Sequence, residues 1–423
     1  MYSEKTLDNG IRVVYQKLDG FHSVCTSIWI GTGSIDEKPE EEGISHFIEH
    51  MLFKGTQRRN AQQIAQEMDS IGGILNAFTS KECTCYHARV IDEHIDTAMD
   101  VLCDFTFHSL LDETELEKEK GVVLEEIKMV EDTPEDLVHE LLGLAYYGDH
   151  PLAKPILGTA QSVSGFSPDD LRNYMNRRYA PKNIVIAAAG GIEFEKLCDL
   201  AEKGTADIQN IFADVTDKQF APAGRHFAAK EKPIEQAHFC LSMPGYDMQD
   251  DNLYALSVLN NAFGGSMSSR LFQNIREQRG LAYDVYSHPT AYSFTGSVTI
   301  YAGVNPERSV EALQVVLEEI DKIAKDGISD DEFTRAKEQL KGNYVLGLES
   351  TGARMNAIGK SKVLTGRMKT AEETLDGIES VTRDSVQQIL EHVFDTQNTS
   401  LSACGNIDIA GFQDAMGVQC ERQ

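Results

Sequence analysis

Apolar residues recur along this chain at two periods, which predict short strands and amphipathic helices. Alternating or continuous apolar runs predict strands over 11–15, 24–30, 74–79, 84–90 and 183–190. Spacings of three and four predict helices over 44–53, 60–71, 112–130, 135–147 and 167–178. The pattern therefore predicts a fold that contains both sheets and helices.

One of these helices carries ionisable side chains on its polar side. Its apolar stripe consists of Ile44, Phe47, Ile48, Met51 and Leu52. The opposite side carries His46, Glu49 and His50, in the order H-x-x-E-H, which is a known zinc-site motif. Histidines at i and i+4 project from one face about a turn apart, so both can bind one ion. Glu49 lies beside them, where it can take a proton from water.

The alternative is that the two histidines match the motif by chance. With twelve histidines in 423 residues, a chance match somewhere is expected on the order of a few per cent of the time. The apolar stripe predicts a buried helix, and buried ionisable groups need partners because burying them unpaired costs several kcal/mol. We therefore favour a metal site.

A catalytic zinc site needs a third protein ligand and one open position. The charged helix over 112–130 is predicted to supply it. Its apolar stripe consists of Leu116, Val123, Ile127 and Val130. Glu119 and Glu126 are seven residues apart and share a face beside this stripe. From the spacing alone, either Glu125 or Glu126 is a candidate ligand.

The strand over 74–79 contains the small, polar step Asn76-Ala77. Such a step suits an exposed edge strand, to which a peptide can add as an extra strand. The alternative is an ordinary hairpin with the strand over 84–90, and only the neighbouring metal motif favours substrate binding.

The second half of the chain resembles the first. Residues 167–183 align without a gap with 382–398, and 111–126 align with 328–343. An internal duplication explains both matches. Glu126 aligns with Asn343, so the second copy has lost this ligand.

Between the two copies the hydrophobic periodicity is lost. We therefore predict a catalytic N-terminal domain over 1–212, a linker over 213–232 and a homologous C-terminal domain over 233–423. The helix predicted over 253–262, the counterpart of the histidine helix, contains no histidine. Metal ligands are thus expected in the first domain alone.

The net charge of −28 argues against nucleic acid or an anionic membrane as a partner. We expect no signal peptide at the N-terminus, and no apolar run approaches the ~18 residues of a membrane span. The eight cysteines form no C-x-x-C pair. We therefore expect free thiols in a reducing compartment, the cytoplasm.

Several of these motifs together resemble the pitrilysin, insulysin and mitochondrial-processing-peptidase family, the inverzincins. The resemblance rests on 46–56, on 72–80, on Glu119 and Glu126, and on 276–283 (R-E-Q-R-G-L-A-Y), and it covers essentially the whole chain. It implies an α+β fold of two homologous domains, each a mainly antiparallel sheet packed with helices. It also implies that two chains form a clamshell.

The resemblance implies a zinc endopeptidase that cleaves extended, unfolded peptides and holds one Zn²⁺ per chain. The implied ligands are His46, His50 and Glu126, which follows His50 by 76 positions, the family's spacing. Glu49 is implied as the general base. Glu119 is implied to orient a ligand or to support the charge around Glu49.

For substrate binding, the resemblance implies the edge strand with Asn76, Ala77 and Phe78. Arg276 would hold the substrate backbone, and Tyr283 would donate to the developing oxyanion. Because one chain carries both the metal motif and this Arg/Tyr pair, the resemblance implies a homodimer with two composite sites.

Two other classes share this fold. A scaffold subunit keeps the fold without the metal, and it usually lacks an intact H-x-x-E-H motif. A peptide-binding chaperone or assembly factor would bind peptides without chelator-sensitive turnover. The intact motif favours the peptidase.

Overall fold

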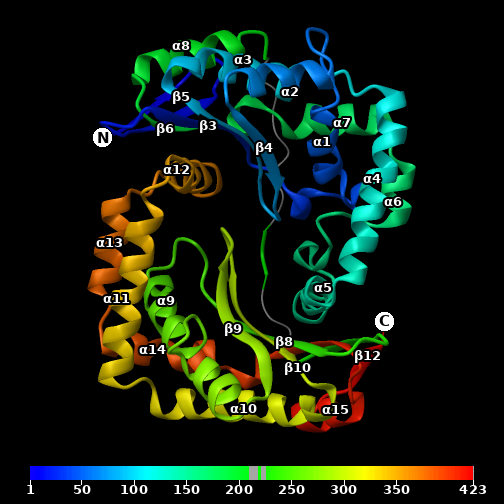
Figure 1. The fold of residues 1–423 in the computed structure, drawn as a ribbon, viewed down its shortest axis with the longest axis vertical. Helices are drawn as coiled ribbons and strands as arrows, with labels where there is room; N and C mark the ends of the chain where they lie inside the picture. Colours follow the sequence, from blue (N-terminus) through cyan, green and yellow to red (C-terminus); the bar gives the residue numbers. More distant parts are fainter. Residues whose placement is uncertain (209–217, 221–224, 423) are drawn as a thin grey trace. The chain divides into compact units, whose positions relative to one another are not determined.

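Two six-stranded sheets, each in its own compact unit, organise the computed structural model of the chain (Figure 1). The structure describes residues 1–208, 218–220 and 225–422. Unit 1 comprises 1–128, 155–217 and 346–371, in so far as they are described, and unit 2 comprises the remaining described residues.

The sheet of unit 1 has the strand order β1-β2-β6-β3-β5-β4. Its strands are β1 (Tyr2–Thr6), β2 (Arg12–Lys17), β3 (Ser23–Ile30), β4 (Ile74–Thr79), β5 (Thr84–Ile91) and β6 (Ile184–Gly190). Only β2 and β6 pair in parallel, and every other neighbouring pair is antiparallel. β4 is an edge strand, so one side of its backbone has no sheet partner in the described part of the chain.

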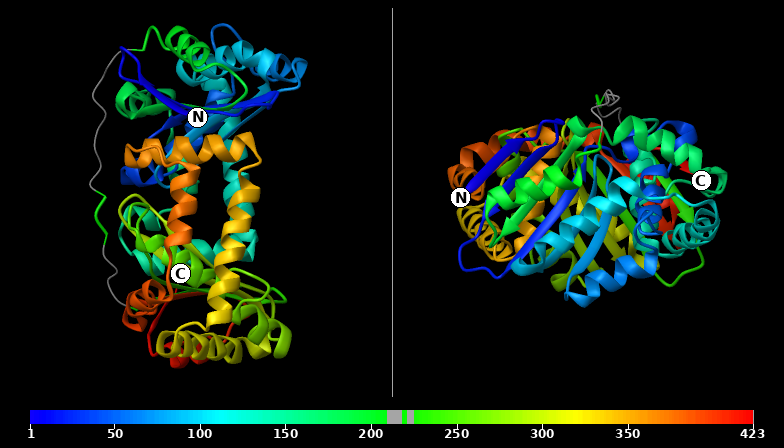
Figure 2. Two further views of the ribbon diagram at one scale, coloured as in Figure 1. Left: turned by 90° about the vertical axis from the view of Figure 1, so that its left-hand side faces the viewer. Right: turned by 90° about the horizontal axis from the view of Figure 1, so that it is seen from above.

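Helices cover both faces of this sheet. The helices of the first half are α1 (Ile44–Leu52), α2 (Ala61–Ser70), α3 (Ile95–His108), α4 (Glu113–Asp132), α6 (Ala160–Gly165), α7 (Pro168–Arg178) and α8 (Phe194–Gly204). The main core lies between them and one face of the sheet. On the other face, α12 (Thr351–Thr365) lies across β2, β3 and β6 (Figure 2).

Close packing of α12 on the sheet depends on a glycine. Trp29 is fully buried, and its indole Nε1 donates to Ser27 Oγ at 2.8 Å. A Cβ on Gly359 would lie 2.2 Å from that indole nitrogen. A glycine here lets the helix backbone approach the tryptophan closely.

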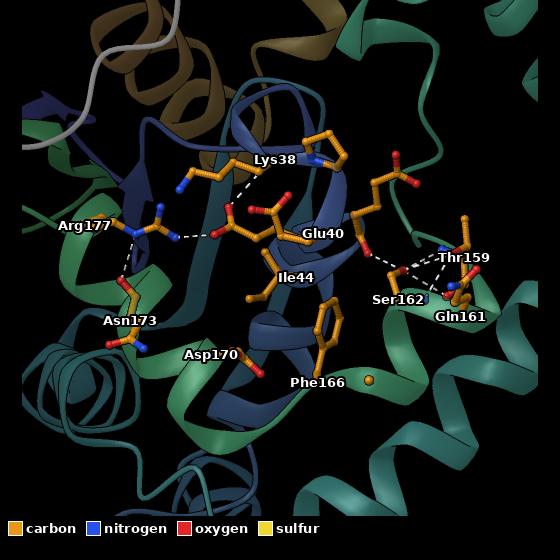
Figure 3. Close-up of a pocket in the computed structure, with 14 residues that line it drawn as sticks. Lys38, Glu40, Ile44, Thr159, Gln161, Ser162, Phe166, Asp170, Asn173 and Arg177 are labelled. Atoms are coloured by element: carbon orange, nitrogen blue, oxygen red, sulfur yellow. Dashed lines mark hydrogen bonds and ion pairs between the residues drawn. The ribbon is translucent and has the colours of Figure 1, made fainter.

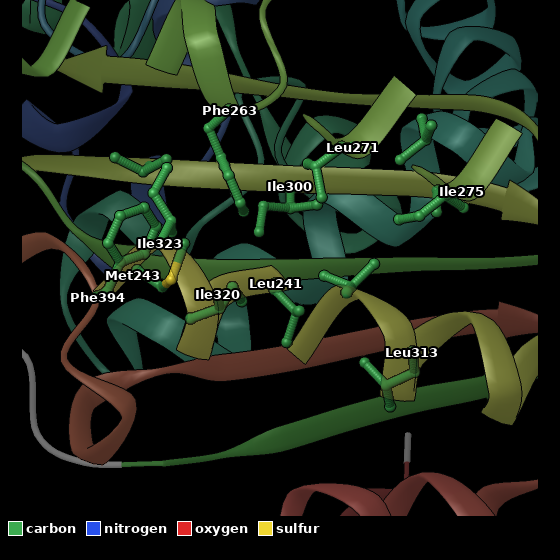
Figure 4. Close-up of a cluster of buried hydrophobic side chains, with 14 of the residues drawn as sticks. Leu241, Met243, Phe263, Leu271, Ile275, Ile300, Leu313, Ile320, Ile323 and Phe394 are labelled. Carbon is green, nitrogen blue, oxygen red and sulfur yellow. The ribbon is translucent and has the colours of Figure 1, made fainter. Parts of the chain in front are cut away.

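The sheet of unit 2 has the order β12-β7-β11-β8-β10-β9. Its strands are β7 (Phe227–Glu231), β8 (Ala237–Pro244), β9 (Ala282–Ala291), β10 (Gly296–Val304), β11 (Ser400–Gly405) and β12 (Cys420–Arg422). Its helices are α5 (Pro134–Tyr147), α9 (Asn252–Phe263), α10 (Ser309–Asp326), α11 (Asp330–Gly347), α13 (Ala371–Ser380), α14 (Arg383–Val393) and α15 (Ile409–Met416). Three helices contain a boundary between units 1 and 2, so part of each belongs to either unit: α4, α11 and α13. Leucine, isoleucine and phenylalanine side chains fill its core (Figure 4).

The two sheets confirm the internal duplication. The order β2-β6-β3-β5-β4 in unit 1 matches β7-β11-β8-β10-β9 in unit 2, with parallel pairing only at the first step of each. α14 corresponds to α7, and α11 corresponds to α4. The starts of the two helices in each pair are separated by the same number of residues as the aligned segments of the sequence. Both sheets are therefore mixed and mainly antiparallel, as the resemblance implied.

The compact units do not coincide with the predicted halves of the chain. α5 precedes the predicted linker yet packs on β8 and β11 of unit 2, whereas α12 follows the linker yet packs on the sheet of unit 1. The predicted boundaries 1–212 and 233–423 therefore do not include this exchange of helices. The apolar pattern of such a helix is the same whichever of the two sheets it packs against. The linker over 213–232 also contains β7, and its residues 213–217 and 221–224 lie outside the described residues.

Among the described residues, no helix is both long and apolar enough to cross a membrane. None of the eight cysteines forms a disulfide in the part of the chain that the structure describes, and seven of them are buried.

Candidate metal centre

The histidine helix α1 forms where the sequence predicts it. Its apolar stripe (Ile44, Phe47, Ile48, Met51, Leu52) is at most 1% exposed and contributes to the main core of unit 1. The side chain of His46 is only 12% exposed, and that of His50 is 18% exposed. Burial of the stripe therefore fixes α1 so that its two histidine side chains are largely shielded from solvent.

An acidic side chain holds the first turn of α1. Gly43 precedes the helix with a φ of +88°, a left-handed conformation that favours glycine. The Glu37 carboxylate accepts hydrogen bonds from the backbone N–H groups of Gly43, at 2.7 Å, and Ser45, at 2.9 Å. It thus satisfies N–H groups that a capping side chain usually satisfies. Burial raises the pKa of Glu37 to about 8, although these hydrogen bonds oppose the rise.

Three potential metal ligands converge at α1. Glu126 Oε2 lies 3.7 Å from His46 Nε2 and 3.4 Å from His50 Nε2. One ligand atom from each of the three residues lies within 4.8 Å of the others. Glu126 Oε2 is buried and has no hydrogen-bond partner among the described residues. The neighbouring Glu125 instead bonds Lys128 on the exposed side of α4.

The two imidazoles differ in their electrostatic surroundings. Burial, and then the neighbouring His50, lower the pKa of His46 to about 4, so its imidazole is neutral at neutral pH. Burial also opposes the charging of His50. Its hydrogen bond to Glu119 and the carboxylates around it outweigh burial and raise the pKa of His50. A cation at this site would take the place of the His50 proton among the carboxylates.

Glu119 orients His50. Its Oε1 accepts from His50 Nδ1 at 2.8 Å, which leaves His50 Nε2 facing Glu126. Its Oε2 accepts from Lys54 Nζ at 2.6 Å. Burial alone would raise the pKa of Glu119, but the hydrogen bonds from His50 and Lys54 outweigh it and lower the pKa. An ionised carboxylate behind a histidine ligand fixes its tautomer and increases its basicity.

Glu49 lies beside this cluster and is held from the edge strand. Thr79, the last residue of β4, donates its hydroxyl to Glu49 Oε2 at 2.6 Å. Burial raises the pKa of Glu49, and the Thr79 hydrogen bond and His50 oppose that rise. A raised carboxylate pKa favours proton transfer near neutral pH.

The predicted substrate strand is the edge strand β4. The Ala77 backbone N–H donates to Asn76 Oδ1 at 2.8 Å, so it is directed away from β5. Alternation along an antiparallel strand then places the backbone groups of Leu75 and Thr79 on the same free side. The Phe78 ring is half-buried and packs edge-on against Trp29, with centroids 5.6 Å apart, on the face of the sheet that α12 covers.

The predicted Arg/Tyr pair lies in unit 2. Arg276 belongs to the π-helix η6 (Phe272–Gln278), and Tyr283 lies near the start of β9. The Arg276 guanidinium lies 4.8 Å from the centroid of the Phe272 ring and 5.6 Å from that of Tyr283. Tyr283 is 78% exposed.

Three residues that support the site are not predicted by the sequence pattern: Glu37, Lys54 and Thr79. Lys54 follows His50 by four positions, a helical spacing that could have pointed to it. Thr79 lies in a strand that was predicted, but only the fold shows that its hydroxyl reaches Glu49. Glu37 lies in an acidic loop, where nothing distinguishes it from its neighbours.

A separate cavity of about 810 Å³ opens beside the first turn of α1 (Figure 3). Arg177 donates to Glu41 at 2.5 Å, and Ser162 donates to the Glu42 carbonyl at 2.7 Å. Of the described residues that line it, none belongs to the H-x-x-E-H motif. This cavity is therefore distinct from the place where His46, His50 and Glu126 converge.

Two family models match the chain. Residues 12–160, which contain α1 and α4, match the model described as "Insulinase (Peptidase family M16)". Residues 165–340 match the model described as "Peptidase M16 inactive domain". The candidate metal ligands fall within the first match, and the Arg276/Tyr283 pair falls within the second.

Solved structures show the same fold. The chain resembles a peptidase M16 inactive domain from Pseudomonas fluorescens with a TM-score of 0.90 and 21% identity, covering 96% of this chain and 98% of the other. It resembles a protease from Helicobacter pylori with a TM-score of 0.90 and 20% identity, covering 96% and 99%.

Closer relatives are bacterial proteins of similar length. The chain is 43% identical over 410 residues to the uncharacterized zinc protease YmxG of Bacillus subtilis, covering 96% of this chain and 100% of YmxG. It is 41% identical over 408 residues to an uncharacterized zinc protease of Streptomyces coelicolor, covering 95% and 88%. The expected family is thus confirmed: the chain belongs to peptidase family M16, the insulinase or pitrilysin family, as one of its half-length bacterial members.

Proposed function

We propose that this chain is a zinc-dependent endopeptidase. The observation that carries the proposal is the convergence of His46, His50 and Glu126 within 4.8 Å, next to Glu49. Two imidazoles and one carboxylate are a known donor set of catalytic zinc, with one position left open. The buried Glu126 oxygen makes no hydrogen bond among the described residues and faces two imidazole nitrogens, an arrangement that fits a cation held by all three groups. When bound there, zinc supplies Lewis-acid polarisation and lowers the pKa of water to about 7.

Glu49 acts as the general base in this proposal. It accepts a proton from the attacking water and returns it to the leaving amine. Thr79 holds one of its oxygens, so the other is available for the transferred proton. The raised pKa of Glu49 supports both steps, because the group must accept and release a proton in one cycle.

The substrate class follows from β4. A peptide that pairs with the free edge of β4 must be extended, because only an extended backbone matches the strand's donors and acceptors. The site is therefore proposed to act on unfolded peptides. Ala77 has an edge-facing N–H that currently bonds the neighbouring Asn76 side chain, and a substrate carbonyl can replace it.

The Arg/Tyr pair and the homodimer complete the proposal. Arg276 is proposed to hold the substrate backbone, and Tyr283 to donate its hydroxyl to the developing oxyanion. The high exposure of Tyr283 supports a role outside the core. Each chain of a homodimer would offer its pair to the partner's metal site. The eight free cysteines support a reducing compartment, the cytoplasm.

Metal removal tests the proposed function. We expect the purified protein to hold one zinc per chain and to cleave a fluorogenic peptide library. A chelator should abolish cleavage and added zinc should restore it, with products identified by mass spectrometry. A scaffold would purify without stoichiometric zinc, and a peptide-binding chaperone would bind the library without turnover. Either result would contradict the proposal.

Replacing Glu119 by glutamine is expected to lower zinc affinity about 10–100-fold, as for other groups that support a histidine ligand. The amide removes the negative charge that now pairs with His50 and Lys54. The measurement is competitive zinc titration against a chelating dye. Glu125→Gln on the same helix is the matched control, since Glu125 is exposed and bonds only Lys128 among the described residues. Equal zinc affinity in the two variants would exclude this positioning role.

A further inference from the structure

A groove of about 600 Å³ opens at the end of β4 that is remote from Glu49. Three large apolar side chains line it although they are exposed: Ile74 by 50%, Ile91 by 46% and Leu346 by 66%. Arg89 and Glu349 add one charge of each sign. The groove thus combines exposed apolar side chains with polar ones, and its lining side chains carry no net charge.

The position of the groove follows from the pleat of the sheet. Leu75 and Ala77 of β4 pack into the main core, and Phe78 packs on the opposite face, which α12 covers. Since side chains alternate along a strand, Ile74 lies on the α12 face with Phe78. Residues 349–351, at the start of α12, form the facing wall. The groove therefore lies on the α12 face of the sheet, at the edge strand β4.

The same strand connects the groove with the candidate metal centre. Thr79 at one end of β4 bonds Glu49, and Ile74 at the other end lines the groove. The five residue steps between them span about 17 Å at the rise of an extended strand. A peptide paired with β4 keeps the same rise, so a residue about five positions from the scissile bond reaches Ile74.

We infer that this groove is a specificity subsite that receives an apolar substrate side chain about five residues from the scissile bond. The inference rests on the proposed function, because the substrate must pair with β4. Apolar side chains gain most from covering Ile74, Ile91 and Leu346, whereas the paired signs of Arg89 and Glu349 give a single charge no net attraction. The enzyme would thus select peptides by a residue remote from the cleaved bond.

Peptide pairs test the subsite. The peptides are identical except for leucine or serine at the position, four to six residues from the cleavage site, that a library digest identifies. We expect the wild type to cleave the leucine peptide with a kcat/KM about tenfold higher, the effect of one small apolar contact. In Leu346→Ser and Ile74→Thr this ratio should fall towards one. Val345, at the preceding position of α11, is 45% exposed and does not line the groove, so Val345→Ser should keep the ratio.

Two further measurements separate the possible outcomes. Peptides too short to reach Ile74 should be cleaved equally by wild type and Leu346→Ser, which reports on the proposed function alone. Binding of the same leucine and serine peptides to Glu49→Gln, by fluorescence anisotropy, tests the groove even if hydrolysis fails. An unchanged preference in both groove variants would overturn the subsite. A change in oligomeric mass of Leu346→Ser without a change in preference would also overturn it and assign the groove to a contact between copies.

Discussion

Glu49→Gln is expected to lower kcat for peptide hydrolysis by about 10²–10⁴-fold, the usual contribution of a general base. The amide has nearly the shape of the carboxylate and can still accept from the Thr79 hydroxyl, so the local geometry should persist. It cannot accept the proton of the attacking water. The three candidate ligands are untouched, so zinc content should remain one per chain. Steady-state kinetics together with elemental analysis of the same sample measure both quantities.

A matched control for this variant is Glu40→Gln. Glu40 is an exposed carboxylate shortly before α1 and lines the separate cavity rather than the candidate metal centre. It should keep the wild-type kcat and zinc content. If Glu49→Gln cleaved peptides at the wild-type rate while its zinc remained bound, another group would have to take the proton, and the role proposed for Glu49 would be wrong.

The sequence predicts local elements well because their causes are local. Ile44, Phe47 and Ile48 define the buried stripe of α1 by spacing alone, and they are buried in the structure. The N-cap of α2 has an equally local cause: the Asn60 side chain accepts from the Gln63 N–H three residues later, and asparagine is a favoured residue at this position. The duplication is also readable, because α4 and α11, and α7 and α14, preserve their patterns of apolar residues at a constant offset.

The exchange of α5 and α12 could not be predicted, because it is a choice between two similar sheets. Each helix has an apolar stripe that can pack on a sheet face, and no residue of the stripe indicates which of the two sheets it packs on. The strand β7 was missed for a related reason. Both of its faces are covered: Phe227 and Ala229 pack into the main core of unit 2, and Ala228 packs on the opposite face with residues of α5. Their sequence shows no alternation of apolar and polar side chains.

The choice between Glu125 and Glu126 shows where sequence spacing reaches its limit. Both belong to a helical pattern, and both are adjacent to the apolar stripe of α4. Packing decides between them: Val123 is buried in the main core, and the resulting rotation of α4 directs Glu126 towards the imidazoles and Glu125 to the exposed side. The spacing of 76 positions between His50 and Glu126, taken from the family resemblance, selects the same residue because family members share this packing.

Replacing Glu126 by glutamine is expected to lower zinc affinity by more than about 100-fold, beyond the effect of groups that only support a ligand. The neutral amide is a poor ligand, and it removes the negative charge from between His46 and His50. Ligand binding stabilises the folded state in proportion to RT ln(1 + [L]/Kd). Zinc at a concentration that just saturates the wild type should therefore raise the Tm of the metal-free wild type and of Glu125→Gln far more than that of Glu126→Gln. Stoichiometric zinc in Glu126→Gln, with the same rise in Tm, would show that the third ligand lies elsewhere.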